Sequence, residues 1–169
     1  LVYGDTNSTL AGALAAAKLH VRIAHVEAGL RSFNRRMPEE INRVVTDHVS
    51  SLLFCPSQTA VNHLAAEGIV NGVYNVGDVM YDAVLKFSKR AQSQSKILST
   101  LDLSSQKYLL ATVHRAENTD DPIRLQNILS AFAEIQETIV WPVHPRTRKV
   151  LERLELNVSF RNLRLIDPV

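Results

Sequence analysis

The sequence predicts an α/β fold in which parallel sheets carry helices on both faces. Short apolar segments alternate with helical stretches along the whole chain, and this alternation is typical of parallel sheets. Helix-start signals follow the apolar segments, at residues 5–8, Pro38, Ser57 and Pro122. The 169 residues, 46% hydrophobic and 21% charged, are sufficient for a packed core.

The first half of the chain is expected to contain four strands and four helices. The strands are predicted at 1–4, 21–26, 52–55 and 73–76, and the helices up to 18, at 38–49, at 58–67 and at 78–89. The alanine-rich stretch before Lys18 is apolar all round, which predicts a buried helix. Gly68 marks a helix end of the usual kind.

A polar segment separates the two halves. Residues 91–106 are rich in Gln and Ser and are predicted to be a linker or domain boundary. Beyond it, strands are expected at 107–113, 138–143 and 163–166, with helices that start at Pro122 and Pro145. The chain opens without Met and stops shortly after the last strand, so we expect it to be part of a longer protein.

The net charge of +2 is too small to favour nucleic acid or an anionic membrane as a partner. The charges are nevertheless unevenly placed. Residues 1–85 carry six basic and eight acidic side chains, whereas residues 86–169 carry thirteen and nine. This asymmetry indicates two halves with different ligand chemistry.

Several kinds of site have no signal in the sequence. The single cysteine, Cys55, excludes an intrachain disulfide and a multi-cysteine zinc site, and it suits a reducing compartment such as the cytoplasm. The six histidines form no H-E-x-x-H pattern, and the glycines form no G-x-G pair. The longest apolar run covers residues 10–17, whereas a membrane span needs about 20 residues.

Charged side chains follow the predicted strands. In open parallel sheets, ligands collect at the carboxyl ends of strands, where helix N-termini also converge. In the first half this rule selects Asp5, Glu27 and, at the next helix start, Glu39. In the second half it selects His114, Arg115, His144 and Arg146. We therefore expect acids of one lobe to meet cations of the other across a shared cleft.

The three carboxylates also have structural interpretations. Asp5 is equally compatible with a helix N-cap. Glu39 and Glu40 could stabilise a helix dipole, and this interpretation is the stronger one for Glu40. Glu27 follows an apolar strand, which predicts partial burial, and buried carboxylates are rare unless paired or functional.

The second-half residues divide in the same way. His114 could be a core histidine, but Arg115 and Glu117 beside it form a polar cluster that cores avoid. Arg146 could belong to a solvated helix face. The functional interpretation is favoured for His144 and Arg146, because phosphate is commonly held where a strand ends and a helix starts.

Clustered carboxylates suit proton transfer, because they raise one another's pKa and so allow an acid and a base to coexist near neutral pH. Cations opposite them could hold a phosphate or a departing diphosphate. The residues therefore predict a two-lobed site with acid/base chemistry for an anionic, phosphorylated ligand.

Four ordered motifs resemble those of the non-hydrolysing UDP-N-acetylglucosamine 2-epimerases. They are Gly4-Asp5-Thr6, His25-Val26-Glu27-Ala28-Gly29-Leu30-Arg31, Pro38-Glu39-Glu40-Ile41-Asn42-Arg43 and Thr112-Val113-His114-Arg115-Ala116-Glu117-Asn118. The resemblance extends over the whole chain and implies the central part of such a protein. It implies the glycosyltransferase-B architecture of two Rossmann-like lobes, truncated at both ends. Residues 1–90 would complete the first lobe, 91–106 would link the lobes, and 107–169 would begin the second.

The resemblance also implies a reaction. UDP leaves C1 of UDP-GlcNAc as the C2 proton is removed, and re-addition with inversion gives UDP-ManNAc, with no metal or redox cofactor. Asp5, Glu27, Glu39 and His114 match the catalytic residues of the family. The residues that match nucleotide or regulatory contacts are Arg115, Glu117, His144 and Arg146.

Further expectations come from the same resemblance. They are a homodimer, activation by the UDP-sugar substrate, and a role in cell-envelope polysaccharide synthesis. Arg115-Ala116 after His114 and Asp78 after Gly77 resemble a subgroup that includes epimerases of other UDP-sugars, such as UDP-2,3-diacetamido-glucuronate. The alternatives are a hydrolysing epimerase and an inactive fragment that binds nucleotide or associates with itself.

Overall fold

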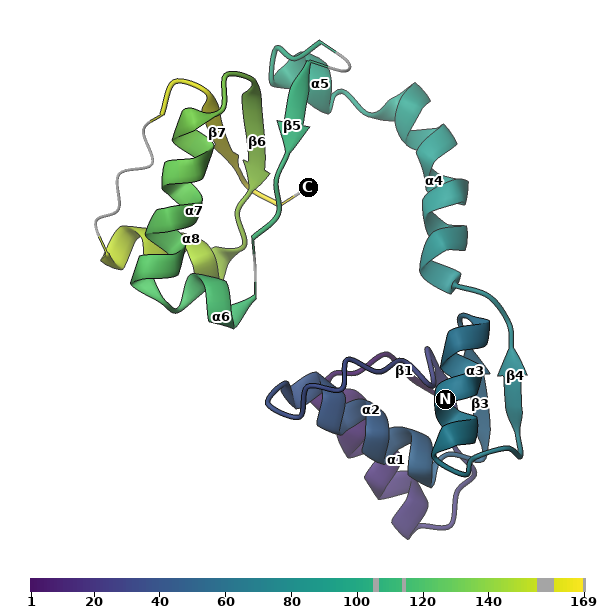
Figure 1. The fold of residues 1–169 in the computed structure, drawn as a ribbon. Helices are drawn as coiled ribbons and strands as arrows, with labels where there is room; N and C mark the ends of the chain where they lie inside the picture. Colours follow the sequence, from purple (N-terminus) through teal and green to yellow (C-terminus); the bar gives the residue numbers. More distant parts are fainter. Residues whose placement is uncertain (105–106, 114, 155–159, 169) are drawn as a thin grey trace. The chain divides into compact units, whose positions relative to one another are not determined.

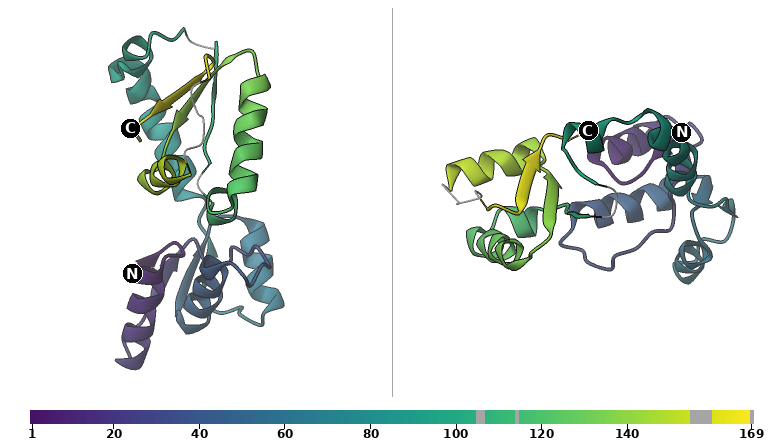
Figure 2. Two further views of the ribbon diagram at one scale, coloured as in Figure 1. Left: turned by 90° about the vertical axis from the view of Figure 1, so that its left-hand side faces the viewer. Right: turned by 90° about the horizontal axis from the view of Figure 1, so that it is seen from above.

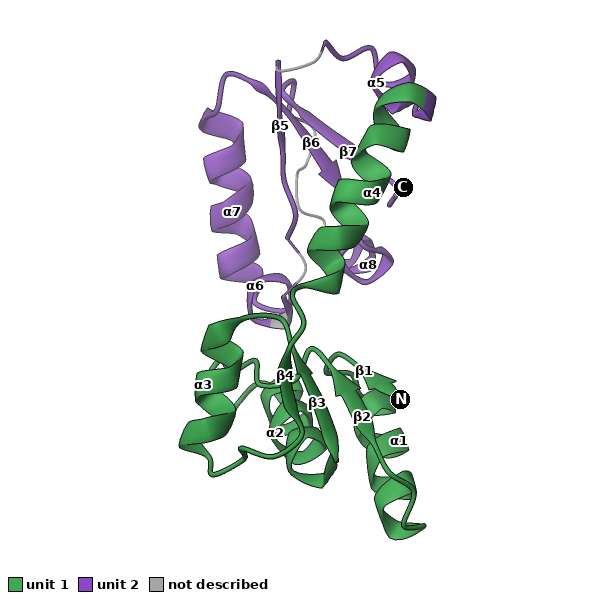
Figure 3. Cartoon of the chain, turned by 90° about the vertical axis from the view of Figure 1, so that its right-hand side faces the viewer, with its two compact units in different colours: residues 1–93 green, residues 94–169 purple. Residues whose placement is uncertain are grey.

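The computed structural model describes residues 1–104, 107–113, 115–154 and 160–168 (Figure 1). The chain divides into two compact units, residues 1–93 and 94–169 (Figure 3). Each unit contains one parallel sheet with helices, so the predicted α/β fold is confirmed.

Unit 1 contains a sheet with the strand order β1-β2-β3-β4, all parallel. Its elements are β1 (Val2–Tyr3), α1 (Asn7–Lys18), β2 (Ala24–Val26), α2 (Pro38–Val49), β3 (Leu52–Cys55), α3 (Gln58–Ala66), β4 (Val73–Asn75) and most of α4 (Val79–Gln94).

The register of this sheet separates its two faces. Val2, His25, Leu53 and Val73 form one row across the four strands. This row faces the helices. Val2 contacts α1 at Gly12, His25 contacts α2, and Leu53 packs in a cluster with α3. The next row carries Tyr3, Val26, Phe54 and Tyr74 on the opposite face.

Local signals explain the helix starts in unit 1. The Thr6 side chain accepts from the Thr9 N–H and caps α1, Pro38 occupies the first turn of α2, and the Ser57 hydroxyl accepts from the Ala60 N–H and caps α3. The expectation that the alanine-rich helix is buried is wrong. α1 buries only Thr9 and Ala13, because one of its sides packs against α2 while the other is exposed.

Unit 2 contains a parallel sheet with the order β5-β6-β7. Its elements are α5 (Ile97–Thr100), β5 (Tyr108–Leu110), α6 (Ala116–Thr119), α7 (Pro122–Glu134), β6 (Thr138–Pro142), α8 (Pro145–Arg153) and β7 (Leu163–Ile166). A linker was expected at residues 91–106. Helix α5, at residues 97–100, and the end of α4, up to Gln94, both lie inside this segment.

The core of unit 2 lies between its sheet and two helices. Trp141 is fully buried and packs edge-on against Phe132 of α7, with 5.8 Å between the two ring centroids. Val150 and Leu151 of α8 belong to the same hydrophobic cluster. Leu163 and Arg164 are consecutive in β7, so their side chains point to opposite faces of the sheet. Leu163 faces the cluster with α7, whereas Arg164 donates to the carbonyl oxygen of Leu101, which directly follows α5. Helices α5 and α7 thus lie on opposite faces of this sheet (Figures 2 and 3).

Candidate functional site

Glu27 stands directly after β2 in a left-handed backbone conformation, with φ of 71°. This conformation is uncommon for a residue with a side chain, and such residues concentrate at functional sites. The Tyr3 hydroxyl donates to Glu27 Oε1 at 3.0 Å, and this hydrogen bond raises the pKa of Tyr3. Residue Glu27 is half-buried, as the sequence predicts.

Asp5 stands two residues after β1, and Glu27 directly follows β2. Both therefore lie at the carboxyl ends of neighbouring parallel strands. The parallel register aligns Tyr3 with Val26, and the Gly4 N–H donates to the Val26 carbonyl. Asp5 is not the helix cap, because that position belongs to Thr6. Its carboxylate instead pairs with Arg43 of α2, Oδ2 to Nη2, at 2.6 Å.

Two residues of α2, to which no role was predicted from the sequence, hold the Asp5 loop. Asn42 Nδ2 donates to the Asp5 carbonyl oxygen at 2.8 Å and to Asn7 Oδ1 at 3.0 Å. Arg43 reaches both Asp5 and, through Nη1 at 3.1 Å, Glu40. The spacing of Glu40 and Arg43, three residues apart on a helix, is the sequence signal that could have indicated their pairing.

Glu40 is buried and anchors the loop that precedes α2. It accepts from the Ser32 N–H at 2.9 Å, the Ser32 hydroxyl at 3.0 Å and the Phe33 N–H at 2.9 Å. Burial acts to raise the pKa of Glu40, but these donors and Arg43 outweigh it and lower the pKa. The helix-dipole interpretation of Glu40 is therefore incomplete, since its main contacts lie outside the helix.

Glu39 lies in the first turn of α2 with its side chain exposed. Within the described part of the chain, it has no hydrogen bond or ion pair. Its carboxylate is therefore accessible to solvent.

The described second-half candidates, Arg115, Glu117, His144 and Arg146, lie around the starts of two helices. His114 is outside the described residues. Arg115 and Glu117 are exposed, Arg115 just before α6 and Glu117 on it. His144 caps α8 and its Nδ1 accepts from the Arg146 N–H at 3.2 Å, so this nitrogen carries no proton in that contact.

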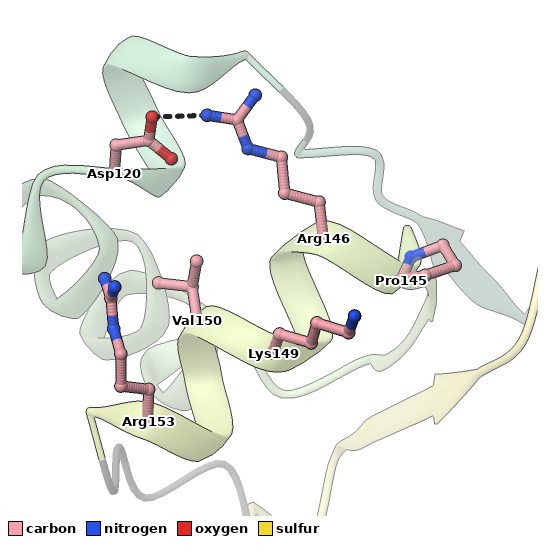
Figure 4. Close-up of a pocket in the computed structure, with 6 residues that line it drawn as sticks. All are labelled: Asp120, Pro145, Arg146, Lys149, Val150 and Arg153. Atoms are coloured by element: carbon pink, nitrogen blue, oxygen red, sulfur yellow. Dashed lines mark hydrogen bonds and ion pairs between the residues drawn. The ribbon is translucent and has the colours of Figure 1, made fainter.

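Arg146 lines an open pocket of about 660 Å³ beside α8 (Figure 4). Its guanidinium donates to Asp120 at 2.6 Å across the pocket. The lining residues are Asp120, Pro145, Arg146, Lys149, Val150 and Arg153. Three cations and one carboxylate give this pocket a positive charge, which suits an anionic ligand.

The described residues contain no group of three His, Cys, Asp or Glu side chains that could hold a metal ion. None of the helices in the described part of the chain combines the length and hydropathy that a bilayer-spanning helix needs.

Comparison with known proteins decides the family. The family model described as UDP-N-acetylglucosamine 2-epimerase matches residues 1–169. The chain belongs to this family. A UDP-N-acetylglucosamine 2-epimerase homolog of Methanococcus maripaludis is 60% identical over 173 residues, which cover 100% of this chain and 48% of that protein.

Two further relatives are similar over almost the whole of this chain. The UDP-2,3-diacetamido-2,3-dideoxy-D-glucuronate 2-epimerase of Pseudomonas aeruginosa is 57% identical to this chain. The aligned region covers 100% of this chain and 47% of that protein. The crystal structure of Methanocaldococcus jannaschii UDP-GlcNAc 2-epimerase in complex with UDP-GlcNAc and UDP is similar with a TM-score of 0.91 and 46% identity, over 99% of this chain and 49% of that one. The chain thus spans about half the length of its relatives.

Proposed function

We propose that the protein carrying this chain is a UDP-N-acetylglucosamine 2-epimerase that interconverts UDP-GlcNAc and UDP-ManNAc. One observation carries the proposal furthest. Asp5 and Glu27 follow neighbouring parallel strands at one sheet edge, and each is oriented by a specific partner, Arg43 at 2.6 Å and Tyr3 at 3.0 Å.

In the proposed reaction, a carboxylate removes the C2 proton while the C1–O bond breaks and its electron pair leaves with UDP. The products of this step are 2-acetamidoglucal and UDP. An oxygen of the UDP diphosphate then bonds to C1, and a proton returns to C2 on the opposite face. Asp5, Glu27 and Glu39 are the proposed acid/base groups, because they match the family's catalytic carboxylates and stand after neighbouring strands or in the first turn of α2.

The cations of the second unit suit the leaving group. We propose that His144 and Arg146 contact the phosphates, with Arg115 and Glu117 at the nucleotide and His114 at the departing diphosphate. The positive pocket beside α8 supports the role of Arg146, because guanidinium groups bind phosphate oxygens in a two-point geometry.

A second substrate has its own support. The relative that acts on UDP-2,3-diacetamido-2,3-dideoxy-D-glucuronate is 57% identical to this chain, whereas the Methanocaldococcus jannaschii UDP-GlcNAc 2-epimerase is 46% identical. The diacetamido-glucuronate sugar is therefore the alternative substrate of the same reaction.

Product analysis separates these possibilities. The intact protein is incubated with each UDP-sugar in turn, and the products are followed by chromatography and proton NMR. The proposal expects the C2 epimer of one sugar to accumulate to equilibrium. Free ManNAc with UDP and no UDP-ManNAc would assign the protein to hydrolysing relatives, and no product from either sugar would contradict the proposal.

The assembly of the protein is a separate proposal. We expect a homodimer that is activated by its own substrate, as the family resemblance implies. Light scattering measures the first, and the curvature of the rate against UDP-sugar concentration measures the second. A monomer with hyperbolic kinetics would contradict both.

A further inference from the structure

His25 lies at the centre of a buried ionic network beneath the proposed acid/base site. The residue belongs to β2 and is 0% exposed. One ring nitrogen, Nε2, lies 2.8 Å from the Gly4 carbonyl oxygen, and the other, Nδ1, lies 2.7 Å from Asp47 Oδ1. Both ring nitrogens therefore face an oxygen at hydrogen-bond distance.

The chemistry of these two oxygens fixes the protons on the ring. The Gly4 carbonyl oxygen can only accept, so Nε2 must carry a hydrogen. Asp47 Oδ2 accepts from the Gly29 N–H at 3.0 Å and from Arg31 Nη1 at 2.7 Å, which is the pattern of an ionised carboxylate. An ionised Asp47 can only accept from Nδ1. Either neutral tautomer of His25 would direct a lone pair at an oxygen less than 3 Å away.

The surrounding charges balance a cationic ring. Arg31 also donates to both oxygens of Glu67 of the α3 C-terminus, at 2.6 and 2.9 Å, and this contact lowers the pKa of Glu67. The four groups thus form a chain of alternating charge, in which His25 contacts Asp47, Asp47 contacts Arg31, and Arg31 contacts Glu67. Among the described residues, other titratable groups nearby are His48 of α2, whose Nδ1 is 3.7 Å from Glu67, His63 of α3, whose Nδ1 is 3.0 Å from the Gly29 carbonyl oxygen, and Cys55 of β3. A balanced set of this kind removes the cost of burying an unpaired charge.

The network is joined to the residues that carry the proposed chemistry. Gly4, whose carbonyl His25 binds, directly precedes Asp5 and has a positive φ of 67°. A side-chain carbon at Gly4 would lie 3.6 Å from Glu27 Oε2, so Gly4 also adjoins the second carboxylate. His25 itself is two residues before Glu27.

We propose that His25 is a positioning residue, which uses N–H groups on both ring nitrogens to tie the end of β1 to Asp47 of α2 and so fixes Asp5 and Glu27 relative to each other. Its effect on turnover rests on the proposed epimerase function, whereas its protonation does not. A buried imidazolium held by two acceptors has one orientation, and this gives the strand ends a fixed geometry.

Nitrogen NMR of the intact protein labelled with ¹⁵N-histidine tests the protonation directly. A histidine with the ordinary reference pKa of about 6.5 is neutral at pH 8. We expect one of the six histidines to keep protons on both nitrogens at this pH. That signal must disappear in His25→Gln and remain in His20→Gln, a control at an exposed histidine. A neutral His25 at pH 8 overturns the proposal.

A second variant covers the case in which His25→Gln does not fold. Asp47→Asn keeps the shape of the side chain but removes the negative charge that requires a proton on Nδ1. We expect the doubly protonated signal to be lost at pH 8 in Asp47→Asn. Its persistence would show that Asp47 does not hold the proton and would contradict the proposal.

Kinetics test the positioning role. Glutamine at position 25 can donate to the Gly4 carbonyl but cannot also donate to Asp47. We expect His25→Gln to lower kcat about 10-fold or more with KM little changed, because misplacement of reacting groups affects turnover more than binding. His20→Gln should keep both parameters. A folded His25→Gln protein with normal kcat overturns the positioning role, whereas an inactive parent protein with the expected NMR signal refutes the proposed function alone.

Discussion

The guanidinium of Arg43 lies 2.6 Å from the carboxylate of Asp5, although 38 positions separate the two residues in the sequence. The same guanidinium contacts the buried Glu40. Helix α2 thus connects the end of β1 to the loop that Glu40 anchors. Asp5 is therefore held by a side-chain network and not by the backbone alone.

Loss of Arg43 should impair turnover more than binding. Arg43→Gln removes the ion pair that orients Asp5, and a small misplacement of a reacting group can cost about 10²-fold in rate. We expect kcat of the intact protein to fall by about that factor while KM changes little. Arg22→Gln, at an exposed residue before β2, is the matched control. Equal rates for the two variants would show that the Asp5–Arg43 pair has no role in catalysis.

Neutral replacements of Glu27 and Glu39 should leave the fold intact and remove proton transfer. General acid/base groups typically contribute about 10² to 10⁴ in rate, so Glu27→Gln and Glu39→Gln should each lower kcat by a factor in this range. Glu134→Gln, at an exposed carboxylate of α7, should have a normal rate. A normal rate in either site variant, with circular dichroism confirming the fold, would give that carboxylate a structural role.

Removal of the Arg146 guanidinium should weaken substrate binding. A hydrogen bond to a charged group contributes about 1.5–3 kcal/mol, so Arg146→Gln should raise KM about 10- to 100-fold with kcat nearly unchanged. Arg161→Gln changes an exposed arginine outside the pocket and serves as control. An unchanged KM in Arg146→Gln would place the phosphates elsewhere.

Alanine at Gly29 should destabilise the protein strongly. Gly29 has φ of 78°, and an added Cβ would lie 2.8 Å from the Ala60 carbonyl carbon. Gly68 has a similar φ of 81° but open space around the same position. Gly68→Ala should therefore cost only the backbone strain, about 1–2 kcal/mol, whereas Gly29→Ala should cost clearly more. Urea unfolding that shows equal losses would contradict the close packing at Ala60.

Cys55 should make the protein lose stability at high pH. Burial and the neighbouring Asp47 raise the pKa of the thiol from 9.0 to about 11. The folded state thus keeps its proton where the unfolded state loses it, so the stabilisation is present below pH 9 and declines up to pH 11. The slope approaches about 1.4 kcal/mol per pH unit in this window. Cys55→Ala should remove that slope in urea unfolding, and an unaltered slope would contradict the burial of the thiol.

Local sequence signals predicted most of the elements. The range 38–49 agrees with α2 and 52–55 agrees with β3, because a proline at a helix start and a short apolar run are read within a few residues. Strand β2 begins at Ala24 and not at 21, since Val21 is exposed and its N–H donates to the Ala16 carbonyl. The extension of α4 to Gln94 was missed because its Gln and Ser residues, interpreted as a linker, also tolerate a helix.

The candidate site could be predicted only in part. The rule that ligands collect at strand ends selected Asp5 and Glu27, which the structure places at one sheet edge. Their partners are distant in the sequence, since 38 positions separate Arg43 from Asp5 and 24 separate Tyr3 from Glu27, so no local pattern reveals them. That the acids meet the cations of the other half stays a prediction.

Incorporation of solvent deuterium at C2 is the decisive test of proton transfer by Asp5, Glu27 and Glu39. The intact protein is incubated with UDP-GlcNAc in deuterated water, and the recovered sugars are examined by mass spectrometry and proton NMR. We expect UDP-ManNAc that carries deuterium at C2, together with deuterium in the UDP-GlcNAc that re-forms. An epimer that keeps its original C2 hydrogen, or no exchange at all, would contradict proton transfer by these carboxylates.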